Sequence, residues 1–338
     1  MAKITEYLEI LLEGNDLTFD QARNLLDIVF EGEVADVSIA AFLAAMRAKG
    51  ATSGELAGLA CSLREHAVHV RTDIDNLVDT CGTGGAELKT FNISTAAALA
   101  AAGAGVYIAK HGNRGITSKC GSADVLAELG VNIAPGPECV ARCISKARIG
   151  FMFAPKFHPA MKHVQPIRQS LDFRTVFNIL GPLANPAGAA AQVMGVPEEG
   201  LVQKIAETLK KLGLKRAMVV HSEGLDEMST MGPTKILELK DGQIAASEFN
   251  PPDYGISLAD FDSLKGGNTQ TNAAIIRDIL LGKDTGPRKD IVVLNAAAAI
   301  IVAGLAHDFA AGIALAESSI ADGKARAALD ALVEISNS

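Results

Sequence analysis

The first part of the chain carries a helical pattern of hydrophobic positions and no strand-like alternation. In the first stretch, apolar side chains recur with a period of about 3.6 residues, at Ile4, Leu8, Leu11 and Leu12. Three further stretches of the same kind have polar residues suited to a helix start, at Thr18, at Ser38 or Asp36, and at Ser53. The pattern predicts a small all-helical domain over residues 1–72.

Beyond residue 73, short apolar runs alternate with longer helical patterns. We expect strands at residues 77–81, 106–109, 151–153, 217–221, 236–239 and 291–294. We expect helices at residues 96–102, 122–130, 137–148, 201–212 and 271–281, and from about residue 310 to the end. A strand, a glycine loop, a helix and a second strand in that order form a βαβ unit, which requires parallel strands. Residues 73–338 therefore predict a larger α/β domain with a central, mainly parallel sheet.

One segment departs from this alternation. Residues 155–186 hold five of the twelve prolines, which interrupt regular helices and strands. We expect loops and short helices that cross between the two domains. Residues of about 165–185 are expected to add to the helical domain.

Composition and charge exclude several classes of function. The chain is 49% hydrophobic and 21% charged, which is typical of a globular protein. Its net charge of −8 and its lack of Trp disfavour a nucleic-acid surface, and no apolar run is long enough for a membrane span. The five cysteines form an odd, sparse set, and the residues after Met1 are amphipathic and unlike an apolar leader. We therefore expect a cytoplasmic protein that acts on a small molecule.

Two glycine-rich loops indicate a phosphate ligand. Gly82-Thr83-Gly84-Gly85 follows the first expected strand, and Ser94 stands where the next helix begins. Glycines let backbone N–H groups approach an anion, and a helix N-terminus favours phosphate, although this loop alone is equally a tight turn. The second loop, residues 110–122, adds three cations, Lys110, Arg114 and Lys119. Because loops after successive parallel strands share one sheet edge, we expect the two to face one crevice.

An acidic pair, Asp226-Glu227, follows the strand expected at residues 217–221. Two carboxylates at the carboxyl end of a strand suit a divalent cation such as Mg²⁺, which also takes water and substrate phosphate oxygens. In isolation the pair would be a solvated acidic turn. Beside a phosphate crevice, the metal interpretation is favoured.

Two arginines in the proline-rich segment, Arg168 and Arg174, stand among apolar residues. A guanidinium binds a carboxylate bidentately, so either residue suits an aromatic or aliphatic acid as ligand. An ion pair between the two domains is the equal alternative at this point.

Several long motifs in order make the chain similar to the anthranilate phosphoribosyltransferases over its whole length. The family's first loop and the run after it correspond to residues 82–85 and 90–95, and its Lys-His-Gly-Asn-Arg loop is intact at residues 110–114. Its Gly-Ser-Ala-Asp stands at residues 121–124. The stretches Phe-Ala-Pro…His-Pro-Ala-Met, Leu-Gly-Pro-Leu…Asn-Pro and Gly-Leu-Asp-Glu are also present.

The resemblance implies an activity, a fold and an assembly. The activity is transfer of phosphoribose from phosphoribosyl pyrophosphate (PRPP) to the amine of anthranilate, with release of pyrophosphate, in tryptophan biosynthesis. The fold is that of the nucleoside phosphorylases and these transferases, a helical domain joined by hinges to a larger α/β domain. The assembly is a homodimer through the helical part.

The resemblance also implies site residues. The donor PRPP is expected to contact Gly82, Gly85, Thr90, Asn92, Ser94, Thr95, Lys110, Asn113, Arg114, Ser118 and Ser122. Up to two Mg²⁺ ions are expected on Ser94, Asp226 and Glu227, and anthranilate is expected to contact Gly82, Asn113 and Arg168, the last through its carboxylate. No protein residue is nominated as a general base, because a neutral aromatic amine is already nucleophilic.

The chain departs from the family pattern at three places. Ala86-Glu87 stands where the family commonly has Asp after the first glycine loop. Gly115 and Cys120 replace two serines of the second loop. Asp172 replaces a common glycine four residues after Arg168, where its carboxylate would pair with an arginine or repel anthranilate.

Two other functions fit parts of the sequence. A pyrimidine nucleoside phosphorylase-like enzyme would share the architecture and the phosphate loops. A non-catalytic, nucleic-acid-binding relative of the transferases would share the fold, although the charge of −8 and the acidic pair disfavour it.

Overall fold

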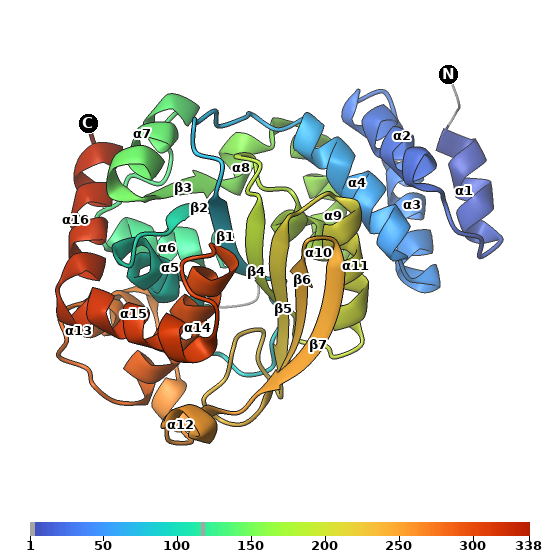
Figure 1. Cartoon of the computed structure of the whole chain (residues 1–338). Coiled ribbons are helices and arrows are strands. Elements are labelled where there is room, and N and C mark those ends of the chain that lie inside the picture. The colour runs from blue at the N-terminus through green and yellow to red at the C-terminus, as the bar shows by residue number, and fades with distance from the viewer. Residues whose placement is uncertain (1–3, 116–118) are drawn as a thin grey trace.

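The computed structural model describes residues 4–115 and 119–338, which form a helical domain beside a larger α/β domain (Figure 1). The helical domain begins with α1 (Ile4–Leu12), α2 (Phe19–Phe30), α3 (Asp36–Lys49) and α4 (Ser53–Glu65). Capping boxes start two of these helices, Thr18 with Gln21 at α2 and Thr52 with Glu55 at α4. The predicted helix-only character of this part is therefore confirmed.

The α/β domain is built on a seven-stranded sheet within the described residues. Its strands are β1 (Leu77–Gly82), β2 (Tyr107–Gly112), β3 (Ile149–Phe153), β4 (Ala191–Gly195), β5 (Arg216–Ser222), β6 (Thr234–Lys240) and β7 (Gln243–Phe249). The order is β3-β2-β1-β4-β5-β6-β7; the first five are parallel and the last two pair antiparallel. The predicted α/β class with a mainly parallel sheet is confirmed.

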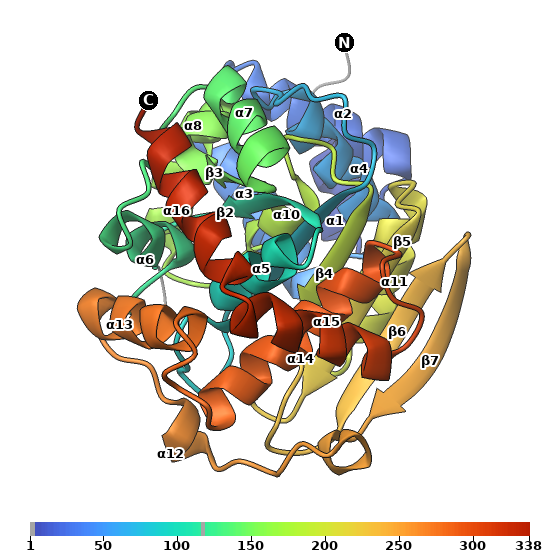
Figure 2. The ribbon, with the colours of Figure 1, turned by 60° about the vertical axis from the view of Figure 1, so that its left-hand side comes forward.

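Helices cover both faces of the sheet, as Figure 2 shows for one of them. That face carries α5 (Ile93–Gly103), α6 (Ser122–Glu128), α13 (Thr269–Leu280), α14 (Pro287–Val302), α15 (Phe309–Ala321) and α16 (Lys324–Ser336). Helix α7 (Pro137–Ala147) packs on both sides, with Cys143 in the core of this face and Ile144 in a smaller core with Ala109 and Met152. The opposite face packs on α11 (Leu201–Lys211) and on the helical domain. Strand β5 supplies both cores by alternation, with Met218 facing the first core and Val219 the second.

The proline-rich segment does cross between the domains in short pieces. It contains α8 (Ala154–Phe157), the 3₁₀ helix η1 (Pro159–His163), α9 (Gln165–Leu171) and α10 (Phe177–Leu183). Between β7 and α13 lie the 3₁₀ helix η2 (Pro251–Tyr254) and α12 (Phe261–Leu264). Ile167, Phe177 and Leu180 share one core with the helices of the helical domain.

The end of α10 is held from three directions. Its successive carbonyls Gly181, Pro182 and Leu183 accept hydrogen bonds at 3.2, 2.7 and 2.7 Å, respectively. The donors are His111 Nδ1 on β2, Gln192 Nε2 on β4 and Arg64 Nε on α4. Since helix ends leave carbonyls without intrahelical partners, these bonds both satisfy α10 and fix it to both domains.

Two features of the sheet differ from the sequence prediction. Residues 291–294 were expected as a strand but lie inside α14, a helix in which every residue from Ile291 to Val302 is buried. A helix surrounded by protein shows no polar face, so a run of apolar, β-branched residues reads equally as a buried strand. Strands β4 and β7 were not predicted, because β4 is a short central strand and β7 is a largely exposed edge.

Helix length and polarity also bear on the membrane question. Among the described residues, no helix combines the length and the apolar character needed to cross a bilayer.

Candidate active site

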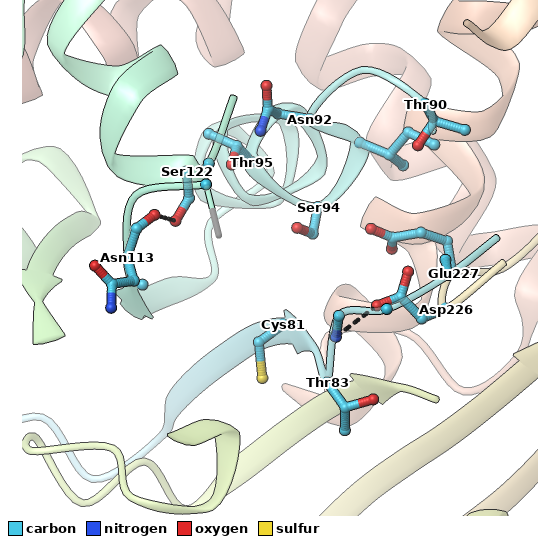
Figure 3. A pocket seen from close by; sticks show the side chains of 18 of the residues that line it. Cys81, Thr83, Thr90, Asn92, Ser94, Thr95, Asn113, Ser122, Asp226 and Glu227 are labelled. Carbon is cyan, nitrogen blue, oxygen red and sulfur yellow. Dashed lines mark hydrogen bonds between the residues drawn. The ribbon is translucent and has the colours of Figure 1, made fainter. Parts of the chain in front are cut away.

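A cavity of about 330 Å³ opens where β1, β2 and the loop after β5 come together (Figure 3). Both glycine-rich loops line it, as the parallel order of the strands predicts. The donor-site residues expected from the resemblance that line it are Gly82, Gly85, Thr90, Asn92, Ser94, Thr95, Lys110, Asn113, Arg114 and Ser122. Ser118, also expected there, lies outside the described residues.

The first loop turns sharply at two glycines, Gly84 with φ +67° and Gly85 with φ +88°. Both values lie in the left-handed region that side chains with a Cβ rarely adopt. Nearby, the hydroxyl oxygens of Thr83 and Thr95 are buried and have no hydrogen-bond partner among the described residues. Buried hydroxyls are normally satisfied, so these two atoms indicate a ligand with hydrogen-bonding oxygens.

The N-terminal turn of α5 faces the same cavity. Ser94 and Thr95 belong to this turn, whose backbone N–H groups attract negative charge. Asn92, just before it, is held at both ends of its amide, since its Nδ2 donates to the Cys120 carbonyl at 3.1 Å and its Oδ1 accepts from Asn272 at 2.9 Å. Asn92 therefore ties the second loop and α13 to the start of α5.

Asp124 organises the second loop. Its carboxylate accepts the N–H groups of Gly115 and Gly121, each at 2.9 Å, and pairs with Arg114 Nη1 at 2.7 Å. The Ser122 hydroxyl donates to the Asn113 carbonyl at 3.4 Å. These bonds draw the two ends of the loop together and partly neutralise the charge of Arg114.

Lys110 is buried inside the sheet edge, with 2% of its surface exposed. Its Nζ donates to the Thr80 carbonyl at 2.6 Å, and burial lowers its pKa while Asp79 acts in the opposite direction. Asp79 itself is fully buried, which raises the pKa of its carboxyl to about 6. The Asn185 amide donates to Asp79 at 2.8 Å and to the Ala109 carbonyl at 2.7 Å. A buried lysine that lines the cavity and a buried carboxyl behind it thus influence each other electrostatically without forming an ion pair within 4 Å.

Asp226 and Glu227 stand on one side of the cavity, with Asn113 and Ser122 on the other (Figure 3). Asp226 Oδ2 accepts the Gly84 N–H at 3.0 Å. Burial raises the pKa of both carboxyls, and burial together with the neighbouring Asp226 raises that of Glu227 to about 8. The raised pKa values mean that burial disfavours the charged form of both carboxyls. A bound cation would stabilise that charged form.

Arg168 does not belong to the residues that line the cavity. On α9, its Nη1 donates to Gln165 Oε1 at 3.2 Å, and its guanidinium lies 5.3 Å from the Phe177 ring centre. Burial lowers its pKa, and within the described residues it forms no ion pair. Asp172 is in the left-handed region at the end of α9, with φ +49°, and pairs with neither arginine. The inter-domain ion pair considered from sequence is therefore absent from this part of the structure.

Of the further lining residues that were not predicted as site residues, five have nitrogen or oxygen in their side chains: Thr83, Lys89, His111, Arg174 and Asn178. Thr83 stands within the glycine motif and His111 directly after Lys110, so both could have been predicted from their positions in these loops. Burial holds the pKa of His111 at about 3, so the ring is neutral and its Nδ1 proton is donated to the Gly181 carbonyl. Arg174 and Asn178 belong to the segment that crosses between the domains. Sequence spacing alone does not predict where this segment lies relative to the sheet.

Comparisons with known proteins agree with this arrangement. Residues 74–326 match the α/β domain of a glycosyl transferase family, and residues 5–67 match that family's helical bundle domain. The anthranilate phosphoribosyltransferase of Herpetosiphon aurantiacus is 48% identical over 337 residues, covering 99% of each chain. The crystal structure of the enzyme from Thermus thermophilus has 40% identity and a TM-score of 0.93, covering 98% of this chain and 99% of that one.

A solved structure with bound ligands is also similar. The anthranilate phosphoribosyltransferase of Saccharomyces cerevisiae in complex with PRPP and Mg has 26% identity and a TM-score of 0.90, covering 99% of this chain and 98% of that one. Matches of this extent favour neither the phosphorylase nor the nucleic-acid-binding alternative.

Proposed function

The chain belongs to the anthranilate phosphoribosyltransferase family, and on that premise we propose how its cavity moves the phosphoribosyl group of PRPP to the amine of anthranilate. The products are N-(5-phosphoribosyl)anthranilate and pyrophosphate, a step of tryptophan biosynthesis. The observation that carries the proposal is the meeting of two glycine-rich loops, the α5 N-terminus and the Asp226-Glu227 pair at one cavity.

The test is the loss of anthranilate fluorescence with PRPP and Mg²⁺, with and without EDTA. We expect turnover that requires both PRPP and the metal. A parallel assay with phosphate and thymidine reports phosphorylase activity, and turnover there without use of anthranilate would contradict the proposal.

We propose that PRPP lies along the first loop, the start of α5 and the second loop. The residues assigned to it are Gly82, Gly85, Thr90, Asn92, Ser94, Thr95, Lys110, Asn113, Arg114, Ser118 and Ser122. Support comes from the unpartnered hydroxyls of Thr83 and Thr95 and from the cationic Lys110 and Arg114 at the same cavity. Phosphate oxygens are acceptors that all of these donors can use.

Magnesium, at up to two ions, is assigned to Ser94, Asp226 and Glu227. Within the described residues no group of three or more His, Cys, Asp or Glu side chains forms a protein cage. Mg²⁺ fits the donors that are present, since it binds through one or two carboxylates and completes its shell with water and phosphate oxygens. When bound, the ion supplies positive charge that stabilises the departing pyrophosphate.

For anthranilate we propose contacts with Gly82, Asn113 and Arg168. Arg168 is a partly buried guanidinium that has no carboxylate partner within the described residues. A ligand carboxylate would provide the negative charge that pairs with it. The neutral His111 lines the cavity, and its Nε2 has no partner among the described residues.

We propose a mechanism of positioning and electrostatic stabilisation without a covalent protein intermediate. The bond from the ribosyl C1 to the pyrophosphate oxygen breaks, the bond from C1 to the amine nitrogen forms, and the amine proton passes to solvent. Lys110 and Arg114 stabilise the negative charge that develops on the leaving group. Arg168 and Asn113 orient the acceptor, which converts a bimolecular reaction into an effectively unimolecular one.

The remaining proposals concern organisation. We divide the chain into residues 1–72, with a contribution from about 165–185, and residues 73–338; the separate matches of residues 5–67 and 74–326 to the helical bundle and α/β domains support this division. We propose a homodimer through the helical part, where Leu12 is 67% and Val37 77% exposed on the contacting helices α1 and α3. Light scattering of the purified protein and of a Val37→Glu variant tests it. A cytoplasmic location follows from the biosynthetic role.

A further inference from the structure

Arg174 has no role in the site described so far, yet its guanidinium lies directly on the first glycine loop. Its Nη2 donates to the Gly84 carbonyl at 3.0 Å, and a Cβ at Gly85 would lie 1.4 Å from its Nη1. Gly85 has a positive φ that residues with a Cβ rarely adopt, and a side chain there would have to displace the Arg174 guanidinium. Arg174 also lines the cavity.

The charge of Arg174 is not compensated by a protein carboxylate. It forms no ion pair in the part of the chain that the structure describes. Lys89 is similar, because its Nζ donates to the Ala86 carbonyl at 2.5 Å. The side chain at position 86 is a methyl group where the family commonly has Asp. The side chains of Arg174 and Lys89 thus donate to uncharged carbonyls of one loop, and both cations can also bind an anion.

The Gly84 peptide connects Arg174 to the acidic pair. Its carbonyl accepts from Arg174, and its N–H donates to Asp226 at 3.0 Å. Arg174 and Lys89 also act to lower the pKa of Asp226, so their fields reach that carboxylate. A pyrophosphate that shares magnesium with Asp226 would therefore lie within the reach of both cations.

We propose that Arg174, assisted by Lys89, binds the pyrophosphate end of the phosphoribosyl donor. The guanidinium leaves the Gly84 carbonyl and takes phosphate oxygens, for which its planar fork is suited. Val176 and Phe177, two and three residues after Arg174, pack in the core that contains the helices of the helical domain. Arg174 therefore contacts the phosphoribosyl donor from the side of the cavity nearest the helical domain. It belongs to the same crossing segment as Arg168. This inference rests on the proposed function.

The experiment compares Arg174→Gln, Arg174→Lys and the wild type by steady-state kinetics and by calorimetric titration with magnesium pyrophosphate. Arg142→Gln, an exposed arginine on α7 outside the site, is the matched control. Loss of a charge-assisted hydrogen bond predicts that Arg174→Gln raises the PRPP KM and weakens pyrophosphate binding about tenfold to a hundredfold. Arg174→Lys, which keeps the charge but not the fork, should lie between that variant and the wild type.

Melting temperatures separate binding from structure. We expect both Arg174 variants to melt within about 3 °C of the wild type, since the bond to Gly84 is exposed. Unchanged PRPP KM and pyrophosphate affinity overturn the inference, as does an increase confined to the anthranilate KM, which would place Arg174 at the acceptor. A wild-type protein that turns over no anthranilate but binds pyrophosphate contradicts the proposed function. In that case the pyrophosphate affinities of the Arg174 variants still show whether Arg174 binds pyrophosphate.

Discussion

The carboxylate of Asp226 is fixed against the first glycine loop by the backbone N–H of Gly84, at 3.0 Å. The fit leaves no space for a side chain, because a Cβ at Gly82 would lie 2.2 Å from the same oxygen. The acidic pair and the loop that precedes α5 therefore form one unit, although they are more than a hundred residues apart in the chain. Changes to either part should affect the metal and the donor together.

Replacing the acidic pair should separate catalysis from stability. In Asp226→Asn and Glu227→Gln we expect magnesium-dependent turnover to fall by about two orders of magnitude. The melting temperature in metal-free buffer should not fall, because burial disfavours the charged form of both carboxyls and each amide imitates the neutral form. Kinetics and thermal unfolding with EDTA measure both, with Asp20→Asn on the exposed surface of α2 as control. A large loss of stability with activity retained would contradict the assignment.

A substitution at Gly195 on β4 tests the position of the acidic pair, because Gly195 lies against the backbone of Asp226. A Cβ there would lie 1.6 Å from the backbone oxygen of Asp226, so Gly195→Ala must displace the acidic pair without touching a substrate. We expect activity to fall by about tenfold or more, with a higher magnesium requirement. Gly232→Ala is the control, since its Cβ meets nothing within 4 Å. Equal activity in the two variants would show that the position of Asp226 does not limit the reaction.

Arg168 should act on the acceptor alone. Arg168→Ala is expected to raise the anthranilate KM about tenfold to a hundredfold, because a bidentate contact to a carboxylate is lost. The PRPP KM should change by no more than about threefold, since Arg168 does not line the donor cavity. Initial rates with each substrate varied in turn decide the matter. A shift in the PRPP KM of the same size would remove Arg168 from the acceptor site.

The sequence predicts the parts of the site that stand directly after strands. The glycine loop and the acidic pair follow β1 and β5, and Lys110 stands near the carboxyl end of β2. The rule that parallel strands end at one edge brings them together. The crossing segment is different. Arg174 and Asn178 reach the cavity because three α10 carbonyls are held by side chains of β2, β4 and α4, and such long-range bonds leave no local pattern.

The limits for the fold have the same origin. Residues 291–294 were predicted as a strand because burial on all sides removes the polar face that identifies a helix. By contrast, Thr18 predicted the start of α2 correctly, since a capping box is a local interaction that four residues encode by themselves.

Asp172 offers a test of backbone strain near the acceptor segment. It adopts φ +49°, which costs a residue with a Cβ free energy that glycine does not lose. We expect Asp172→Gly to raise the free energy of unfolding by about 0.5–1 kcal/mol and Asp172→Ala to lower it. The anthranilate KM should change by less than about twofold, because Asp172 is exposed and pairs with neither arginine. Urea denaturation of the three proteins measures the first effect. A more stable Ala variant would contradict it.

Asp79 should make stability depend on pH in a defined direction. Burial raises its pKa from 3.8 to about 6, so in this window the folded protein binds more protons than the unfolded chain. The contribution of Asp79 to stability is therefore greatest below pH 3.8, falls as the pH rises towards about 6, and is constant above that, with a total change of about 3 kcal/mol.

Asp79→Asn imitates the protonated carboxyl at every pH and keeps an acceptor for Asn185. The difference in unfolding free energy between variant and wild type should therefore move in favour of the variant as the pH is raised from about 4 to about 7. Comparing the two proteins cancels groups that titrate in both, including His111, whose lowered pKa acts with the opposite slope in this window. Urea denaturation at several pH values measures the difference. A difference that stays constant would mean that Asp79 is already ionised across the range, held in that form by Lys110.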